Sequence, residues 1–149
     1  MKIRNLTQYV MSSALKEAVM EYPTDGLVVE LKYCPKNSRR YISGTYYRRA
    51  RNYEDGKYIR LRINRNNKYP LEVNFKTSQY YEKPNAHGEM ERYQKLRTVR
   101  FDNPHDLILA VFLHEFSHYM DHMEGIKGTY KQTKADKFAL SILDKLEII

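Results

Sequence analysis

The sequence of 149 residues predicts a single α+β domain, and three observations lead to that fold class. Apolar residues recur with helical spacing near the N-terminus and again toward the C-terminus, whereas the stretch between them alternates with the period of two that is typical of strands. Apolar residues make up 42% of the chain and charged residues 30%, as in globular proteins. We therefore expect, within residues 1–149, an N-terminal helix, a small, mostly antiparallel twisted sheet and two C-terminal helices.

The N-terminal helix is predicted from an apolar stripe, formed by Leu6, Val10, Ala14 and Val19. This region has no continuous apolar segment and no small-residue cleavage site, so it does not resemble a signal peptide. The lone Cys34 cannot form an internal disulfide. No run approaches the roughly 20 apolar residues of a membrane span. A cytoplasmic protein with no membrane partner is the default expectation.

The sheet is predicted from short alternating segments that end at turn residues. "GLVVELKYCP" is typical of a strand ended by Pro35, and "EDGK" indicates a hairpin between "RYISGTYYRRARNY" and "KYIRLRINRN". Further strands are expected in "LEVNF" and "LRTVRF". Residues 77–95 are polar, contain a proline and a glycine, and favour a loop or flap.

The net charge of +8 is concentrated in residues 38–70, where arginines alternate with tyrosines. A basic surface interleaved with aromatic rings can bind single-stranded nucleic acid through charge and stacking. The same alternation is also how a half-exposed sheet is encoded. Nucleic acid therefore remains an open alternative as a partner.

Two C-terminal helices follow the strands. The first begins after Asn103, a good N-cap, with Pro104 at the first helical position, and it ends before Gly125. The second is expected to begin near Thr129 or Thr133, either of which could cap it, and to end near Leu146.

The first of these helices carries the pattern H-E-x-x-H at His114, Glu115 and His118. Residues four apart share one face of a helix, so both imidazoles can reach one ion, with zinc the expected metal. Glu115 would then take a proton from a metal-activated water. A bound ion would also explain why an apolar helix tolerates these polar side chains, because burying a charge without a partner costs free energy.

A third metal ligand is harder to assign. His122 lies more than a turn past the ion and is expected at the helix C-terminus, protonated against the dipole. Asp121 is expected to be solvated. If the second helix doubles back, Asp136 returns to the level of the two histidines, although it could instead cap that helix together with Thr133.

H-E-x-x-H followed by a helix with A-D-x-F-A resembles the gluzincin branch of zinc metallopeptidases, including ImmA/IrrE-type and minigluzincin-type proteins, over about the last 45 residues. The resemblance implies a zincin-like fold, a glutamate ligand where this chain has Gln132, and at Asp136 an aspartate that orients a ligating histidine. Since an anionic oxygen is the better zinc donor, we expect Asp136 as the ligand, with Gln132 as the alternative.

Two further features have counterparts in known zincins. "LRTVRF" resembles the edge strand on which zincins align substrate. Spartan-type proteases also pair H-E-x-x-H with a basic, nucleic-acid-binding character. However, their third ligand is a histidine well downstream, and none follows His122.

The predicted function is a zinc-dependent metallopeptidase that acts on a protein or peptide, with Zn²⁺ on His114, His118 and Asp136 and with Glu115 as the general base. Tyr130 could donate a hydrogen bond to the transition state. The alternative is a nucleic-acid-binding or protein-binding module on an inactive or weakly active zincin scaffold, which Gln132 keeps open.

Overall fold

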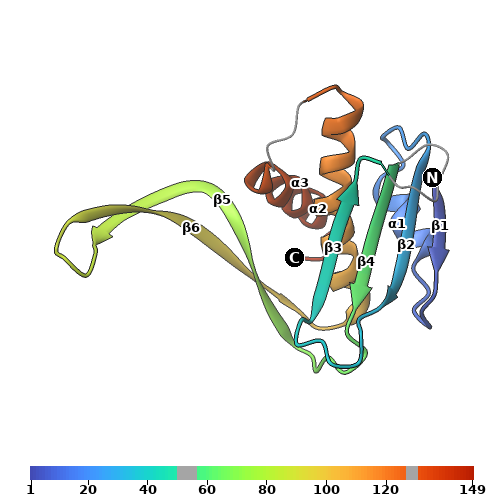
Figure 1. Ribbon diagram of the computed structural model, residues 1–149, viewed down its shortest axis with the longest axis horizontal. Helices are drawn as coiled ribbons and strands as arrows, with labels where there is room; N and C mark the ends of the chain where they lie inside the picture. The colour runs from blue at the N-terminus through green and yellow to red at the C-terminus, as the bar shows by residue number, and fades with distance from the viewer. Residues whose placement is uncertain (50–56, 127–130) are drawn as a thin grey trace.

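The computed structural model describes residues 1–49, 57–126 and 131–149 and is α+β, as predicted (Figure 1). Its strands are β1 (Lys2–Asn5), β2 (Leu27–Tyr33), β3 (Ile42–Tyr47), β4 (Lys57–Ile63), β5 (Leu71–Pro84) and β6 (Met90–Phe101). Its helices are α1 (Ser12–Ala18), α2 (Pro104–Met123) and α3 (Gln132–Lys145).

Four strands form a mixed sheet in the order β1-β2-β4-β3. β1, β2 and β4 are parallel, and β3 is antiparallel to β4 at one edge. The prediction of a mostly antiparallel sheet is therefore wrong, because two of the three pairings in this sheet are parallel. Parallel neighbours need a crossover connection, and α1 lies in the one between β1 and β2.

The predicted N-terminal helix is shortened and displaced. Residues 2–5 pair with β2 as a strand, and α1 covers only Ser12–Ala18. Leu6 and Val10 of the predicted stripe are 52% and 86% exposed, whereas Met11, Leu15 and Val19 point into the core. Backbone pairing with β2 thus outweighs the local helical pattern in the first residues.

The helices cover one face of the four-stranded sheet, and no described helix or strand covers the other face, which we call the open face (Figure 1). α2 packs on β3 and β4, and α3 packs on α2 and β5. The core between them contains fully buried side chains from β4 and α2, including Ile59, Leu61, Phe112, Leu113 and Phe116. No helix in the described ranges is both long enough and apolar enough to span a membrane.

β5 and β6 form a separate antiparallel hairpin that projects from the body (Figure 1). It replaces the loop predicted over residues 77–95, because strand pairing continues through that stretch to Pro84 and Met90. "LRTVRF" is confirmed as a strand, but it pairs with β5 and not with the main sheet. The free edge of the main sheet beside α2 is β3.

Candidate metal and catalytic site

Helix α2 begins and ends as predicted. Its two ends determine where its polar residues lie along the helix axis. The Asn103 side chain accepts a hydrogen bond from the Asp106 N–H at 2.9 Å, and Pro104 is the first helical residue. At the other end the Gly125 N–H donates to the His122 carbonyl, and Gly125 has φ of +72°. Such a left-handed residue is a common helix terminator.

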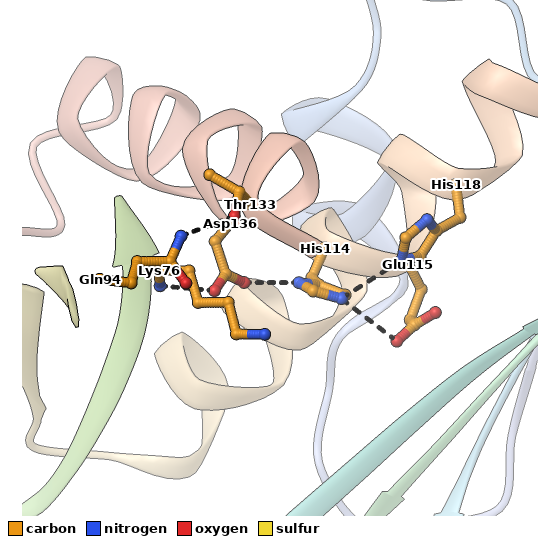
Figure 2. Close-up of polar contacts among 7 residues, drawn as sticks. All are labelled: Lys76, Gln94, His114, Glu115, His118, Thr133 and Asp136. Carbon is orange, nitrogen blue, oxygen red and sulfur yellow. Dashed lines mark hydrogen bonds and ion pairs between the residues drawn. The ribbon is translucent and has the colours of Figure 1, made fainter. Parts of the chain in front are cut away.

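The two histidines of the motif converge on one point (Figure 2). Nε2 of His114 lies 3.3 Å from Nε2 of His118, and the two rings meet edge to face. Both histidines are half-buried. This is the arrangement in which two neutral imidazoles share one cation.

Asp136 approaches His114 from the opposite side of the ring. Its Oδ1 lies 2.6 Å from Nδ1 of His114, and its Oδ2 accepts the main-chain N–H of Lys76 at 2.7 Å (Figure 2). A carboxylate on Nδ1 fixes the tautomer of a histidine and leaves Nε2 free for a metal. The structure thus places Asp136 where the resemblance expects an orienting aspartate, and its predicted role as a metal ligand finds no support in this geometry.

Gln132 is the first residue of α3 and adjoins the two motif histidines. Its side chain interacts with both His114 and His118. Its Oε1 is buried without a hydrogen-bond partner among the described residues. A buried amide oxygen without a partner costs free energy unless a donor or a cation satisfies it.

Glu115 is held between α2 and the edge strand β3. Its residue is 6% exposed, and its Oε1 lies 4.0 Å from Nε2 of His114. The main-chain N–H of Tyr46 hydrogen-bonds to the carboxylate. A Cβ on Gly44 would lie 2.9 Å from Cγ of Glu115, so a glycine is needed where β3 passes this side chain.

Burial and charge give the three motif residues different proton affinities. Burial raises the pKa of Glu115, against the opposing effect of His114. Burial lowers the pKa of His114, but the hydrogen bond to Asp136 and nearby negative charges outweigh it, so the net shift is upward. Burial and the charge of His114 lower the pKa of His118. A carboxylate with a raised pKa can both accept and return a proton near neutral pH.

A pocket of about 210 Å³ opens beside Glu115 between β3, β5 and α2. Its walls are mostly apolar, with Ile42, Val73, Phe75 and Val111 among the lining side chains. The polar side chains of the lining are those of Ser43, Asn74, His114, Glu115 and Asp136. An apolar pocket with a few converging polar groups is the usual form of a small binding site.

Two expectations about the end of α2 are corrected. Asp121 is not solvated, because it is 7% exposed and forms an ion pair with Lys134 at 2.5 Å. Nδ1 of His122 lies 2.7 Å from the Tyr46 hydroxyl. Burial and the charges of Arg48 and neighbouring cations lower the pKa of His122, so it is not the protonated group expected against the helix dipole.

The expected caps of α3 are not used. Its N-cap is Lys131, without a side-chain cap, and the hydroxyl of Thr133 instead accepts a hydrogen bond from Gln94 at 2.8 Å. Asp136 is engaged by His114 and Lys76, so it cannot complete a capping box. Thr129 and Tyr130, and with them the proposed transition-state donor, lie outside the described residues.

The sequence did not point to three groups that shape the site: Gly44, Tyr46 and the main-chain N–H of Lys76. The "SGTYY" segment offered one signal, since a glycine inside a strand often marks a close approach. Comparison with protein-family models, with curated proteins and with solved structures found no match. The geometry of the site is therefore the basis for its proposed function.

Proposed function

We propose that the protein is a zinc metallopeptidase whose metal is held by His114, His118 and Gln132. One observation carries the proposal: two imidazole Nε2 atoms meet 3.3 Å apart, and the Gln132 side chain, which interacts with both rings, has a buried amide oxygen with no hydrogen-bond partner among the described residues. Two nitrogens and one oxygen suit zinc, which in hydrolases keeps its fourth position open.

The set of donor atoms fits a metal ion, but its third ligand would be a neutral amide. Within residues 1–49, 57–126 and 131–149, no group of three or more His, Cys, Asp or Glu side chains could hold a metal ion. A third protein ligand from this part of the chain would therefore be the amide of Gln132, a neutral and weaker donor than a carboxylate. We expect zinc affinity below that of a site with an acidic third ligand.

The remaining groups have distinct roles in peptide hydrolysis. Bound zinc would act as a Lewis acid and lower the pKa of water. Glu115 takes the proton of the attacking water and returns it to the leaving amine, which its burial and raised pKa favour. Asp136 holds the Nδ1 proton of His114, so that Nε2 keeps its lone pair for the metal.

An extended substrate would pair with the edge strand β3, and not with the strand "LRTVRF" that the resemblance to zincins predicts for this role. A peptide added to that edge would pair by main-chain hydrogen bonds beside Glu115. One of its side chains would enter the pocket lined by Ile42, Phe75 and Val111, which favours an apolar residue next to the cleaved bond.

The test is zinc content per chain together with peptidase activity on a mixed peptide library, after purification without added metal. We expect about one zinc per chain, none in His118→Ala, and zinc retained in Glu115→Gln with activity reduced by about 10²- to 10⁴-fold. Gln132→Glu should bind zinc more tightly than the unmodified protein, and Gln132→Ala more weakly.

Several results would contradict the proposal. If the folded protein takes up no zinc when zinc is supplied, the metal site is refuted. If zinc binds but Glu115→Gln leaves cleavage unchanged, the observed activity comes from elsewhere. Zinc affinity that is equal in Gln132→Ala and the unmodified protein would remove Gln132 from the ligand set.

A further inference from the structure

The open face of the four-stranded sheet has a chemistry unlike the rest of the molecule. Along β4, Tyr58, Arg60 and Arg62 alternate with Ile59, Leu61 and Ile63 of the core and therefore lie on the face away from the helices. Tyr58 is 4% exposed on that face, and the two arginines are partly exposed. Strand register places further cations on the same face. They are Lys2 and Arg4 of β1 and Lys32 of β2.

Positive charge on this face is poorly balanced. Glu30 is its one acidic residue on the four strands, and it is shared by Arg4 at 3.9 Å and Arg60 at 3.7 Å. Lys2, Lys32 and Arg62 form no ion pair with any described residue. The Nε atom of Arg62 is buried and has no hydrogen-bond partner among those residues. Like charges held together in this way are relieved by an anionic partner.

Aromatic rings lie at one end of the same face. Tyr47 of β3 and Tyr58 of β4 are directly opposite each other, with ring centroids 5.6 Å apart and planes inclined at 28°. The guanidinium of Arg60 lies over both rings, 5.6 Å and 5.4 Å from their centroids. Tyr47 is partly exposed, so a planar group can reach this stack. Tyrosine rings and arginine planes are the groups on which proteins stack unpaired bases.

We propose that this open face binds a single-stranded nucleic acid, with phosphates on the cations of β1, β2 and β4 and a base against Tyr47 and Arg60. The site lies on the opposite side of the sheet from His114, so it is separate from the proposed peptidase function. Phosphodiester oxygens would balance the cations, and the Arg62 guanidinium would gain an acceptor.

The shape and composition of the face favour a single strand over other polyanions. Four strands about 4.8 Å apart make a surface roughly 15 Å wide. The major groove of a duplex is about 12 Å wide and admits a helix or a two-stranded ribbon. A membrane-binding surface would expose large apolar side chains for insertion, and none of those that are exposed lies on the outward positions of β1–β4.

The experiment measures binding of the full chain to a fluorescein-labelled, mixed-sequence single-stranded DNA of about 20 nucleotides, by anisotropy from 50 to 300 mM KCl. The test variant is Arg60→Gln/Arg62→Gln. The matched control is Lys16→Gln/Lys137→Gln, which removes the same charge from exposed positions on α1 and α3. EDTA is present throughout, so the result does not depend on a metal.

We expect the test variant to bind at least tenfold more weakly, with the slope of log Kd against log salt reduced by about 1.4, since each phosphate contact of a single strand contributes about 0.7. The control should remain within about twofold of the unmodified protein. Tyr47→Leu should weaken binding by about tenfold with an unchanged salt slope, because it removes stacking and no charge.

Circular dichroism checks that each variant is folded. If Arg60→Gln/Arg62→Gln does not fold, Lys2→Gln/Lys32→Gln on the same face takes its place. The proposal is overturned if the control loses as much affinity as the test variant, or if no binding occurs at 50 mM KCl. It is also overturned if a duplex of the same sequence, or vesicles containing phosphatidylserine, bind as tightly as the single strand at equal phosphate concentration.

Discussion

The two faces of strand β4 differ sharply in burial and charge. On one face Ile59, Leu61 and Ile63 are fully buried against the helices. On the other, Arg60 and Arg62 point away from the core and have little acidic compensation. The seven residues of β4 thus contribute to an apolar core on one face and a basic surface on the other, because successive side chains of a strand point to opposite faces.

The difference shows that one face of a strand can serve stability, which requires close packing, while the other can serve a partner, which requires accessible charged and aromatic groups. The helix-covered face leaves little freedom, because Glu115, Gly44 and the core side chains are packed together. On the open face, Lys2, Lys32 and Arg62 form no ion pair with a described residue. Substitutions on the two faces should therefore have different effects on folding.

The largest effect on folding should come from Leu61→Ala on the covered face. Removal of a fully buried leucine leaves a cavity and should lower the free energy of unfolding by about 2–5 kcal/mol. Arg62→Gln, the next residue on the open face, should change it by less than about 0.5 kcal/mol. Urea unfolding of both variants makes the comparison, and similar losses would show that the open face is also structural.

Asp136→Asn tests the support of the histidines on the covered side. The change keeps an acceptor for His114 but replaces the oxygen that accepts the Lys76 N–H, so zinc affinity should fall about 10- to 100-fold. Asp144→Asn on the same helix, which breaks an exposed ion pair with Arg97, is the control. Competition with a zinc chelator gives the affinities. A loss above about 10³-fold would instead make Asp136 a direct ligand.

Gly44→Ala tests the close packing of β3 on α2. The new Cβ would lie 2.6 Å from Cγ1 of Val111 and 2.9 Å from Cγ of Glu115, so one of them must move. We expect a loss of about 1–3 kcal/mol in unfolding free energy and a reduction in activity, measured on the same preparation. The double variant with Val111→Ala should recover part of the stability. No recovery would place the strain elsewhere.

The smallest effect concerns Tyr58 on the open face at high pH. Burial raises its pKa to about 12, above the ordinary value near 10. Between these values the unfolded chain has lost the proton and the folded chain retains it, so stability falls as pH rises. Tyr58→Phe should make the decline from pH 10 to 12 shallower, whereas exposed Tyr41→Phe should leave it unchanged. Equal slopes in all three proteins would contradict the assignment.

The helices near the C-terminus were the most predictable part of the fold. Asn103, Pro104 and Gly125 act through local chemistry, so the sequence predicts the position of α2 closely, and with it the shared face of His114 and His118. Strand order was not predictable, because pairing of residues 2–5 with β2 depends on contacts distant in sequence. For the same reason residues 77–95 appear loop-like in isolation and form strands when paired.

The role of Asp136 could not be derived from spacing alone. When α3 doubles back, the Asp136 carboxylate reaches the level of the histidines. At that level an oxygen could face a metal at Nε2 of His114 or could face Nδ1 on the other side of the ring. The distinction depends on a few ångströms of helix position, which β5 helps to fix through Lys76. The resemblance to gluzincins, by contrast, implies an orienting aspartate at this position, and Oδ1 of Asp136 lies 2.6 Å from Nδ1 of His114.

The hydrogen bond from Lys76 to Asp136 comes from the main chain, so it belongs to the position and not to the lysine. In a scan of all substitutions, nearly every residue at 76 would preserve this donor, and proline would remove it. Position 76 would then accept almost any substitution, and only the loss of function with proline would show that it matters. An alignment of relatives would hide the same dependence, since any sequence without proline there supplies the N–H. The search for residues that maintain this histidine should therefore include backbone positions whose side chains vary freely.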